Sequence, residues 1–132
     1  MTETLSHIAM RKLNGSSASD CYPPFNSVSV SLASPDNTLV IDVPLVAKER
    51  VYTHDVACIY DDGSFKILGR EDNIINSGGI KIQAEELESL LKPVIKDGVF
   101  AITSAPDPKY GEIVILAVEQ SVDKSAVRDV LS

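Results

Sequence analysis

Apolar and polar positions alternate through the first half of the chain, and this period of two is typical of half-buried β-strands. Val28, Val30 and Leu32 alternate with serines. The segment 38–43 is rich in β-branched residues and ends at Pro44, which cannot donate a ladder hydrogen bond. The pattern predicts two strands at these positions.

The clearest local signal is a β-hairpin in which the segments 56–60 and 64–68 flank Asp61-Asp62-Gly63. An Asp-Gly pair between two alternating runs favours a tight turn, because Gly tolerates the positive φ that such a turn requires. A second, shorter hairpin is predicted, with strands at 73–76 and 80–82 and a turn at Ser77-Gly78-Gly79.

Helical spacing enters the pattern in the second half of the chain. Leu87, Leu90 and Leu91 follow the i, i+3, i+4 spacing of one helix face, which predicts a helix over 83–92 that Pro93 ends. Strands are expected at 98–104 and 112–119 with a loop at 105–111 between them, and a last helix is expected from Asp123, a good N-cap residue.

The change in character between the two halves falls at Gly69-Arg70-Glu71-Asp72. We therefore expect an α+β protein with two domains, a β-rich one over 1–70 and a mixed one over 71–132. The last helical pattern is still in phase at the end of the sequence, which indicates a fragment of a longer protein. The alternative is a complete small domain with frayed ends.

Composition excludes several classes of protein. The 132 residues hold 12 Lys and Arg against 19 Asp and Glu, a formal net charge of −7, which argues against nucleic acid as a partner. No apolar run approaches the length of about 20 residues that a membrane span needs. Cys21 and Cys58 form no C-x-x-C motif, and we expect no disulfide framework, no zinc site and a cytoplasmic location.

Several motifs occur in order along the chain. The run 51–88 reads VYTHDVACIYDDGSFKILGREDNIINSGGIKIQAEELE, with T-x-D, D-G and G-R-x-D motifs, a glycine loop and a Glu-rich helix. A P-D-x-x-x-G-E segment follows at 106–112, and Thr2-Glu3 match the end of a Y-G-x-T-E motif. This series resembles the acyl-CoA synthetase, or adenylate-forming AMP-binding, superfamily.

The resemblance implies both an architecture and a reaction. Members of the superfamily make an acyl-adenylate from a carboxylic acid and ATP, and then transfer the acyl group to CoA. The implied fold is a β-rich remnant of a distorted barrel from the N-terminal domain, followed by a small α+β lid domain that swings about a hinge. ATP, Mg²⁺ and CoA are the implied cofactors and co-substrates. Such a remnant exposes apolar surface, which favours homodimerisation or aggregation.

The resemblance also assigns roles to single residues. Thr2 would contact the AMP phosphate and Glu3 would bind Mg²⁺, a hard cation that prefers oxygen ligands. Asp55 would accept hydrogen bonds from the ribose, and Arg70 would reach the ribose or phosphate region. Asp72 aligns with the hinge residue, a conformational role. The alternatives are an ordinary capping or solvated pair for Thr2 and Glu3, and a salt bridge for Arg70.

The glycine loop is implied to line the CoA side of the site. Ser77, Gly78 and Gly79 would approach the nucleotide and the pantetheine arm, because glycine permits close backbone approach. Alone, the same three residues are typical of a tight turn. The sequence departs from the family at His54, where Gly is usual, and at Asn76, where Lys is frequent. We expect His54 to be a surface side chain.

Two motifs of the superfamily do not occur in the sequence. These are the P-x-x-x-x-G-K segment that holds the catalytic lysine and the Ser/Thr/Gly-rich phosphate loop. Because adenylation depends on positioned donors that neutralise the triphosphate, we expect the isolated chain to be catalytically inert.

The acid substrate is indicated by a short segment. Residues 2–9 (TETLSHIA), with Arg11 and 13–15, resemble o-succinylbenzoate–CoA ligases of menaquinone biosynthesis, and Ser6 and His7 would then face the acid. For His7 the alternative is a structural contact. The open alternatives for function are another acyl- or aryl-CoA ligase, an adenylation domain of a peptide synthetase, and a non-enzymatic acidic binding module.

Overall fold

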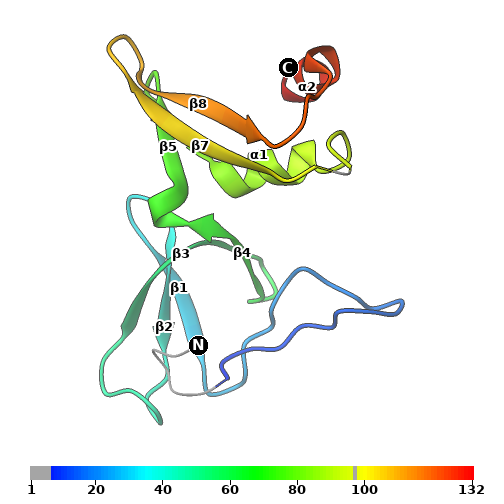
Figure 1. Ribbon diagram of the computed structural model, residues 1–132. Coiled ribbons are helices and arrows are strands. Elements are labelled where there is room, and N and C mark those ends of the chain that lie inside the picture. Colours follow the sequence, from blue (N-terminus) through cyan, green and yellow to red (C-terminus); the bar gives the residue numbers. More distant parts are fainter. Residues whose placement is uncertain (1–6, 97) are drawn as a thin grey trace. The chain divides into compact units, whose positions relative to one another are not determined.

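The computed structural model describes residues 7–96 and 98–132 (Figure 1). The chain divides into two compact units, Met1–Glu71 and Asp72–Ser132, and each has its own apolar core. None of the helices within the described ranges has the length and apolar character needed to cross a membrane.

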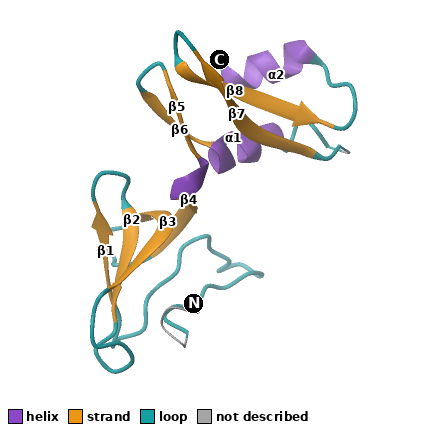
Figure 2. Cartoon of the chain, turned by 60° about the vertical axis from the view of Figure 1, so that its left-hand side comes forward, coloured by secondary structure: helices purple, strands orange, loops and turns teal. Residues whose placement is uncertain are grey.

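The first unit is built on an antiparallel sheet in the order β1-β2-β3-β4 (Figure 2). In the described residues the sheet is open, with β1 and β4 as its outer strands, and Tyr22 adds an isolated bridge to Phe65. The strands are β1 (Ser29–Ala33), β2 (Thr38–Asp42), β3 (Val51–Ile59) and β4 (Phe65–Arg70).

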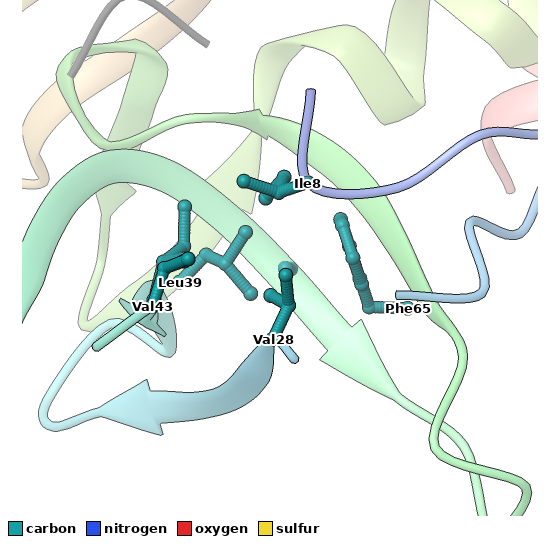
Figure 3. Close-up of a cluster of buried hydrophobic side chains, with 7 residues drawn as sticks. Ile8, Val28, Leu39, Val43 and Phe65 are labelled. Carbon is teal, nitrogen blue, oxygen red and sulfur yellow. The ribbon is translucent and has the colours of Figure 1, made fainter. Parts of the chain in front are cut away.

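The core of the first unit lies on one face of this sheet (Figure 3). Leu39 and Ile41 project from β2 to the same side because strand side chains alternate, and both are fully buried. Ile8, from the N-terminal segment, packs into the same cluster as Phe65 of β4. The remaining buried members are Val28, Val43 and Ala57.

The second unit combines a four-stranded antiparallel sheet, in the order β6-β5-β8-β7, with two helices. A short 3₁₀ turn, η2 (Glu71–Asn73), precedes its first strand. The elements are β5 (Ile74–Ser77), β6 (Ile80–Gln83), α1 (Ala84–Leu91), β7 (Phe100–Asp107), β8 (Gly111–Val118) and α2 (Lys124–Leu131).

The helices and the sheet of the second unit share one core. Leu91 is fully buried in a cluster with Ile75 and Ile102, and Leu87 and Val127 pack against it from α1 and α2. Leu87 and Leu91, four residues apart, thus face the core as their spacing indicated, because such residues lie on the same side of a helix. Leu90, which the same pattern placed on this face, is 52% exposed, so the buried face is narrower than predicted.

The α+β fold class is confirmed, and both predicted helices are present within one or two residues of the expected bounds. Asp123 caps α2 as expected, since its carboxylate accepts a hydrogen bond of 2.9 Å from the Ser125 N–H. Hydrogen bonds from the Ser125 hydroxyl and, second, from its backbone N–H lower the pKa of Asp123.

Two local expectations were wrong. Residues 105–107 belong to β7 and not to a loop, because Pro106 pairs with Glu112 and Asp107 with Gly111, which shortens the turn to three residues. Gly69 and Arg70 do not break the strand pattern either, since they continue β4 opposite Val56 and Asp55. In both places the pairing with a partner strand overrides the local signal.

We expect Leu91→Ala to lower the free energy of unfolding by about 2–5 kcal/mol, because it leaves a cavity in a fully buried site. Leu90 is the matched control: it neighbours Leu91 on α1 but is 52% exposed, so Leu90→Ala should change stability by about 0.5 kcal/mol. Urea unfolding of the two variants followed by circular dichroism measures the difference, and equal losses would contradict this account of the core.

Candidate functional site

The two charged residues that the sequence singled out near the first hairpin lie opposite each other. Asp55 on β3 and Arg70 on β4 are cross-strand partners, and Arg70 Nη1 donates to Asp55 Oδ1 over 3.4 Å. Their side chains are 23% and 51% exposed, so both remain accessible to a ligand. An ion pair with this exposure contributes little to stability. Its main consequence is to orient the Asp55 carboxylate.

The backbone beside Asp55 is held from the interior of the sheet. The buried Thr53 hydroxyl donates to the Leu39 carbonyl over 2.8 Å and accepts a hydrogen bond of 3.2 Å from the Asp55 N–H. The β3–β4 register also shifts between Val56 and Ala57, which is the signature of a β-bulge. Bulges redirect side chains, and this one lies directly after Asp55.

The structure places His54 at the surface, on the opposite face of β3 from its sequence neighbours Thr53 and Asp55. Its imidazole is 66% exposed, and its Nδ1 lies 2.9 Å from Glu71 Oε2. A surface position was expected for this residue, and Glu71 gives it a partner in the same unit. The contact ties the last residue of the first unit to β3.

A hollow of about 280 Å³ opens beside Asp55. Its walls are mostly apolar and include the rings of Tyr22 and Phe65, which stack with centroids 5.7 Å apart at an interplanar angle of 22°. The Arg11 guanidinium lies over the Tyr22 ring of this stack, 5.2 Å from the ring centroid. The hollow is lined by His7, Ile8, Ala9, Tyr22, Asp55, Phe65 and Ile67.

The hollow combines two chemical features. Apolar and aromatic walls can accept a flat or aliphatic group, and one carboxylate can accept hydrogen bonds from paired hydroxyls. Tyr22 and Phe65 were not identified as site residues from the sequence, because Tyr22 lies in a loop without periodicity and Phe65 lies in a strand pattern that indicates structure and not a site. The Tyr22–Phe65 bridge, with hydrogen bonds of 2.6 and 3.0 Å, brings the loop to β4, and an ion pair of 3.7 Å between Asp20 and Lys66 joins the same two segments.

Asp72 lies in the 3₁₀ turn between β4 and β5, at the first position of the second unit. The next residue, Asn73, is tied to α1 through a hydrogen bond of 2.6 Å from its amide nitrogen to Glu85 Oε1. Gln83 Nε2 donates to the other oxygen of Glu85 over 2.5 Å. The carboxylate of Glu85 thus fixes the start of the second unit to its own helix.

The glycine loop forms the turn of the β5–β6 hairpin. Ser77 pairs with Ile80, and Gly78 and Gly79 occupy the two turn positions with φ of 58° and 83°. Positive φ at both central positions is the geometry of a type I′ turn, which glycine adopts without strain. The Gly78 N–H donates to the Tyr110 carbonyl over 2.8 Å, so this turn lies against the β7–β8 turn.

Thr2, Glu3 and Ser6 lie outside the described residues. Elsewhere in the described part of the chain, no group of three His, Cys, Asp or Glu side chains is placed to hold a metal ion. The structure therefore brings together Asp55 and Arg70, adds His7 at the same hollow, and leaves the expected Mg²⁺ ligand undescribed.

No family model matches the chain, but curated proteins and solved structures are similar to it. A medium/long-chain-fatty-acid–CoA/3-oxocholest-4-en-26-oate–CoA ligase of Mycobacterium tuberculosis is 40% identical over 67 residues, which are 49% of this chain and 12% of the relative. The human mitochondrial acyl-coenzyme A synthetase ACSM2B is 43% identical over 56 residues, 41% of this chain and 9% of the relative. The alignments thus span about a tenth of these curated relatives.

Solved structures match almost the whole chain. An acyl-CoA synthetase (AMP-forming)/AMP-acid ligase II-like protein from Dyadobacter fermentans is 28% identical with a TM-score of 0.55, covering 98% of this chain and 38% of that one. ATP-bound MatB from Rhodopseudomonas palustris gives 21% identity and a TM-score of 0.77, with 99% and 32% covered. Escherichia coli MenE with a bound OSB-AMS analogue gives 21% and 0.74, with 98% and 32% covered.

The last two structures share the fold of this chain, and the two curated relatives are similar to it in sequence over 49% and 41% of its length. The relatives and solved structures to which this chain is similar carry the names of acyl-CoA ligases, acyl-CoA synthetases and AMP-acid ligases.

Proposed function

We propose that the chain contributes to an ATP-dependent acid–CoA ligase that forms an acyl-adenylate and then an acyl-CoA thioester. The observation that carries this proposal is the Asp55–Arg70 pair at the aromatic hollow. The family resemblance assigns these two residues to the ribose and phosphate region, and they lie in contact across β3 and β4 with Asp55 lining the hollow. The relatives named as fatty acid–CoA ligases support the same class of reaction.

In this proposal the Asp55 carboxylate accepts hydrogen bonds from the ribose hydroxyls of ATP and of the adenylate. Arg70 orients that carboxylate and places positive charge near the phosphate side. The apolar wall with Tyr22 and Phe65 excludes water from the nucleotide, which strengthens each polar contact made there. ATP supplies the activating adenylyl group. Thr2 would contact the phosphate and Glu3 would hold Mg²⁺, both in the segment before the described residues.

The proposal also assigns the two units. The first, 1–70, would be the end of the AMP-binding N-terminal domain, and the second, 71–132, part of the mobile C-terminal domain, so that the chain is a C-terminal piece of the ligase. Asp72 would be the pivot. Glu71 is tied back to His54 on β3, and Asn73 is tied forward to Glu85 on α1. A change in backbone angles between these two anchors would leave both units intact.

Ser77, Gly78 and Gly79 would serve the CoA-dependent step. Their turn offers backbone groups without side chains, which permits close approach of a ligand to the main chain. The 132 residues contain neither a phosphate loop nor a G-K segment for the catalytic lysine. We therefore propose that binding of the nucleotide ribose is the part of the activity that the chain can show by itself.

For the acid substrate we propose o-succinylbenzoate. The segment 2–15 carries this resemblance, and His7 lines the hollow beside Asp55. MenE structures with OSB-AMS or an analogue bound share the fold. The competing substrate class is fatty acids, because the curated relatives carry those names.

Asp55→Asn should weaken binding of AMP to the chain about tenfold, since it replaces charge-assisted hydrogen bonds to the ribose by weaker ones. NMR titration with AMP measures the affinity from the amide signals of β3 and β4. The exposed Glu49→Gln is the charge-matched control in the same unit and should bind AMP like the wild type.

A ligand variant makes the test specific. The 2′,3′-dideoxy form of AMP should bind the wild type and Asp55→Asn with equal affinity, because it lacks the hydroxyls that the carboxylate accepts from. A wild-type chain that binds dideoxy-AMP as tightly as AMP, or an Asp55→Asn chain that discriminates the two ligands as strongly as the wild type does, would refute the ribose assignment.

The substrate proposal is tested in a ligase that contains this chain together with the phosphate loop and the lysine segment. We expect o-succinylbenzoate to support ATP–pyrophosphate exchange at a higher kcat/KM than medium- or long-chain fatty acids. His7→Ala should lower kcat/KM for o-succinylbenzoate and leave the KM for ATP unchanged. Faster exchange with the fatty acids would reject o-succinylbenzoate and keep the ligase class.

A further inference from the structure

The two hairpins of the second unit are joined by little backbone pairing. Along β5 and β8 the register pairs Ser77 with Gly111 at the ends of the strands, whereas β5 pairs with β6 and β7 with β8 along their full lengths. In both views of the molecule the turns at 78–79 and 108–110 lie at the same end of this sheet (Figures 1 and 2). Side chains must therefore supply part of the connection between the hairpins.

Glu112, the last residue of the P-D-x-x-x-G-E segment, supplies that connection. Its Oε2 accepts a hydrogen bond of 2.8 Å from the Asn76 N–H on β5, and its Oε1 accepts one of 2.8 Å from the Ser104 hydroxyl on β7. One carboxylate on β8 thus holds both neighbouring strands. The two hydrogen bonds lower the pKa of Glu112 below its ordinary value, with that from Asn76 the larger cause.

The turn beside it is rigidified by the same motif. The Asp107 carboxylate accepts hydrogen bonds from the backbone N–H groups of Lys109 and Tyr110, at 2.8 and 2.9 Å. Gly111 then closes the turn with a φ of 81°. This geometry presents the Tyr110 carbonyl to the Gly78 N–H at 2.8 Å.

The contact between the turns leaves little free space. A Cβ added at Gly78 would lie 3.4 Å from Tyr110 Cδ1, within van der Waals contact of the ring. The Gly78-Gly79 turn is therefore fixed on one side by the Tyr110 turn and at its base by Glu112. Asn76, the residue that Glu112 holds, lies two positions before Gly78.

We propose that Glu112 is a positioning residue that holds the Gly78-Gly79 turn in place through the backbone of Asn76. The part of this proposal that concerns catalysis rests on the proposed function, in which the turn serves the CoA-dependent step. Through the turn, Glu112 would set the affinity for CoA and leave the adenylation step, which needs other residues, unaffected.

Amide hydrogen exchange in the 132-residue chain tests the positioning role directly. Glu112→Ala should raise the exchange rates at Asn76 and Gly78 about tenfold. The Asn76 N–H loses its acceptor, and the turn that presents the Gly78 N–H to the Tyr110 carbonyl loses the contact that holds it. The amide of Lys92, which bonds the Glu88 carbonyl at the end of α1, reports whether the unit stays folded and should keep its rate. Unchanged rates at Asn76 and Gly78 would overturn the proposal.

Two further variants separate positioning from general stability. Glu112→Gln keeps an oxygen acceptor for the Asn76 N–H and an amide that can donate to the Ser104 oxygen, so exchange should return to within about threefold of wild type. Glu119→Ala removes an exposed glutamate just after the same strand and should change nothing. Exchange as fast in Glu112→Gln as in Glu112→Ala would contradict the assignment.

The pH dependence gives a readout that a packing role would not produce. Because the folded pKa of Glu112 is lowered, its stabilising contacts are complete above the ordinary value of 4.5 and are lost as the pH falls through the folded pKa. The Asn76 amide proton should titrate with that lower midpoint in the wild type and not in Glu112→Gln. Among the described residues, the ionisable groups near this contact include Lys81, opposite Asn76, and Asp107, Lys109 and Tyr110 in the turn.

In the complete ligase, Glu112→Ala should raise the KM for CoA about tenfold, leave ATP–pyrophosphate exchange unchanged, and be rescued by Glu112→Gln. Raised amide exchange together with a raised KM for CoA supports both proposals. Raised amide exchange with an unchanged KM for CoA confirms that Glu112 positions the turn and rejects the CoA-side role of that turn.

Discussion

Antiparallel register is the constraint on which both units depend, because it decides which side chains far apart in the sequence face each other. It places Asp55 opposite Arg70, 15 residues away, where the two form an ion pair. It also places Ser77 opposite Gly111, which brings the two glycine-containing turns of the second unit together. A shift of one residue in either ladder would turn these side chains to the other face of the sheet.

The apolar cores hold the registers in place. In the first unit, Leu39 and Ile41 can be buried together only when β2 presents one particular face to Ile8 and Phe65. In the second, Leu91 and Ile102 impose the same condition on α1 and β7. The Asp55–Arg70 ion pair is partly exposed and stabilises the fold little, so the positions of these two residues follow from the packing of their apolar neighbours.

The two units divide the proposed chemistry between them. The first carries the apolar hollow with Asp55, and the second carries the turn at Gly78 that Glu112 and Tyr110 hold. Each group is fixed inside its own unit, by Thr53 in one and by the P-D-x-x-x-G-E segment in the other. In the proposed function, a pivot at Asp72 would therefore move groups that are already arranged within each unit.

The sequence alone determined the α+β class, the hairpin at 61–63, the presence of α1 and the Asp123 cap, because these depend on local periodicity and turn chemistry. Tertiary structure decided what requires partners. Tyr22 lies at the hollow through its bridge to Phe65, β7 extends to Asp107 because β8 pairs with it, and Glu112 meets Asn76 from 36 residues away. Such contacts join segments whose separation is set by sheet register, and no pattern within either segment encodes the other.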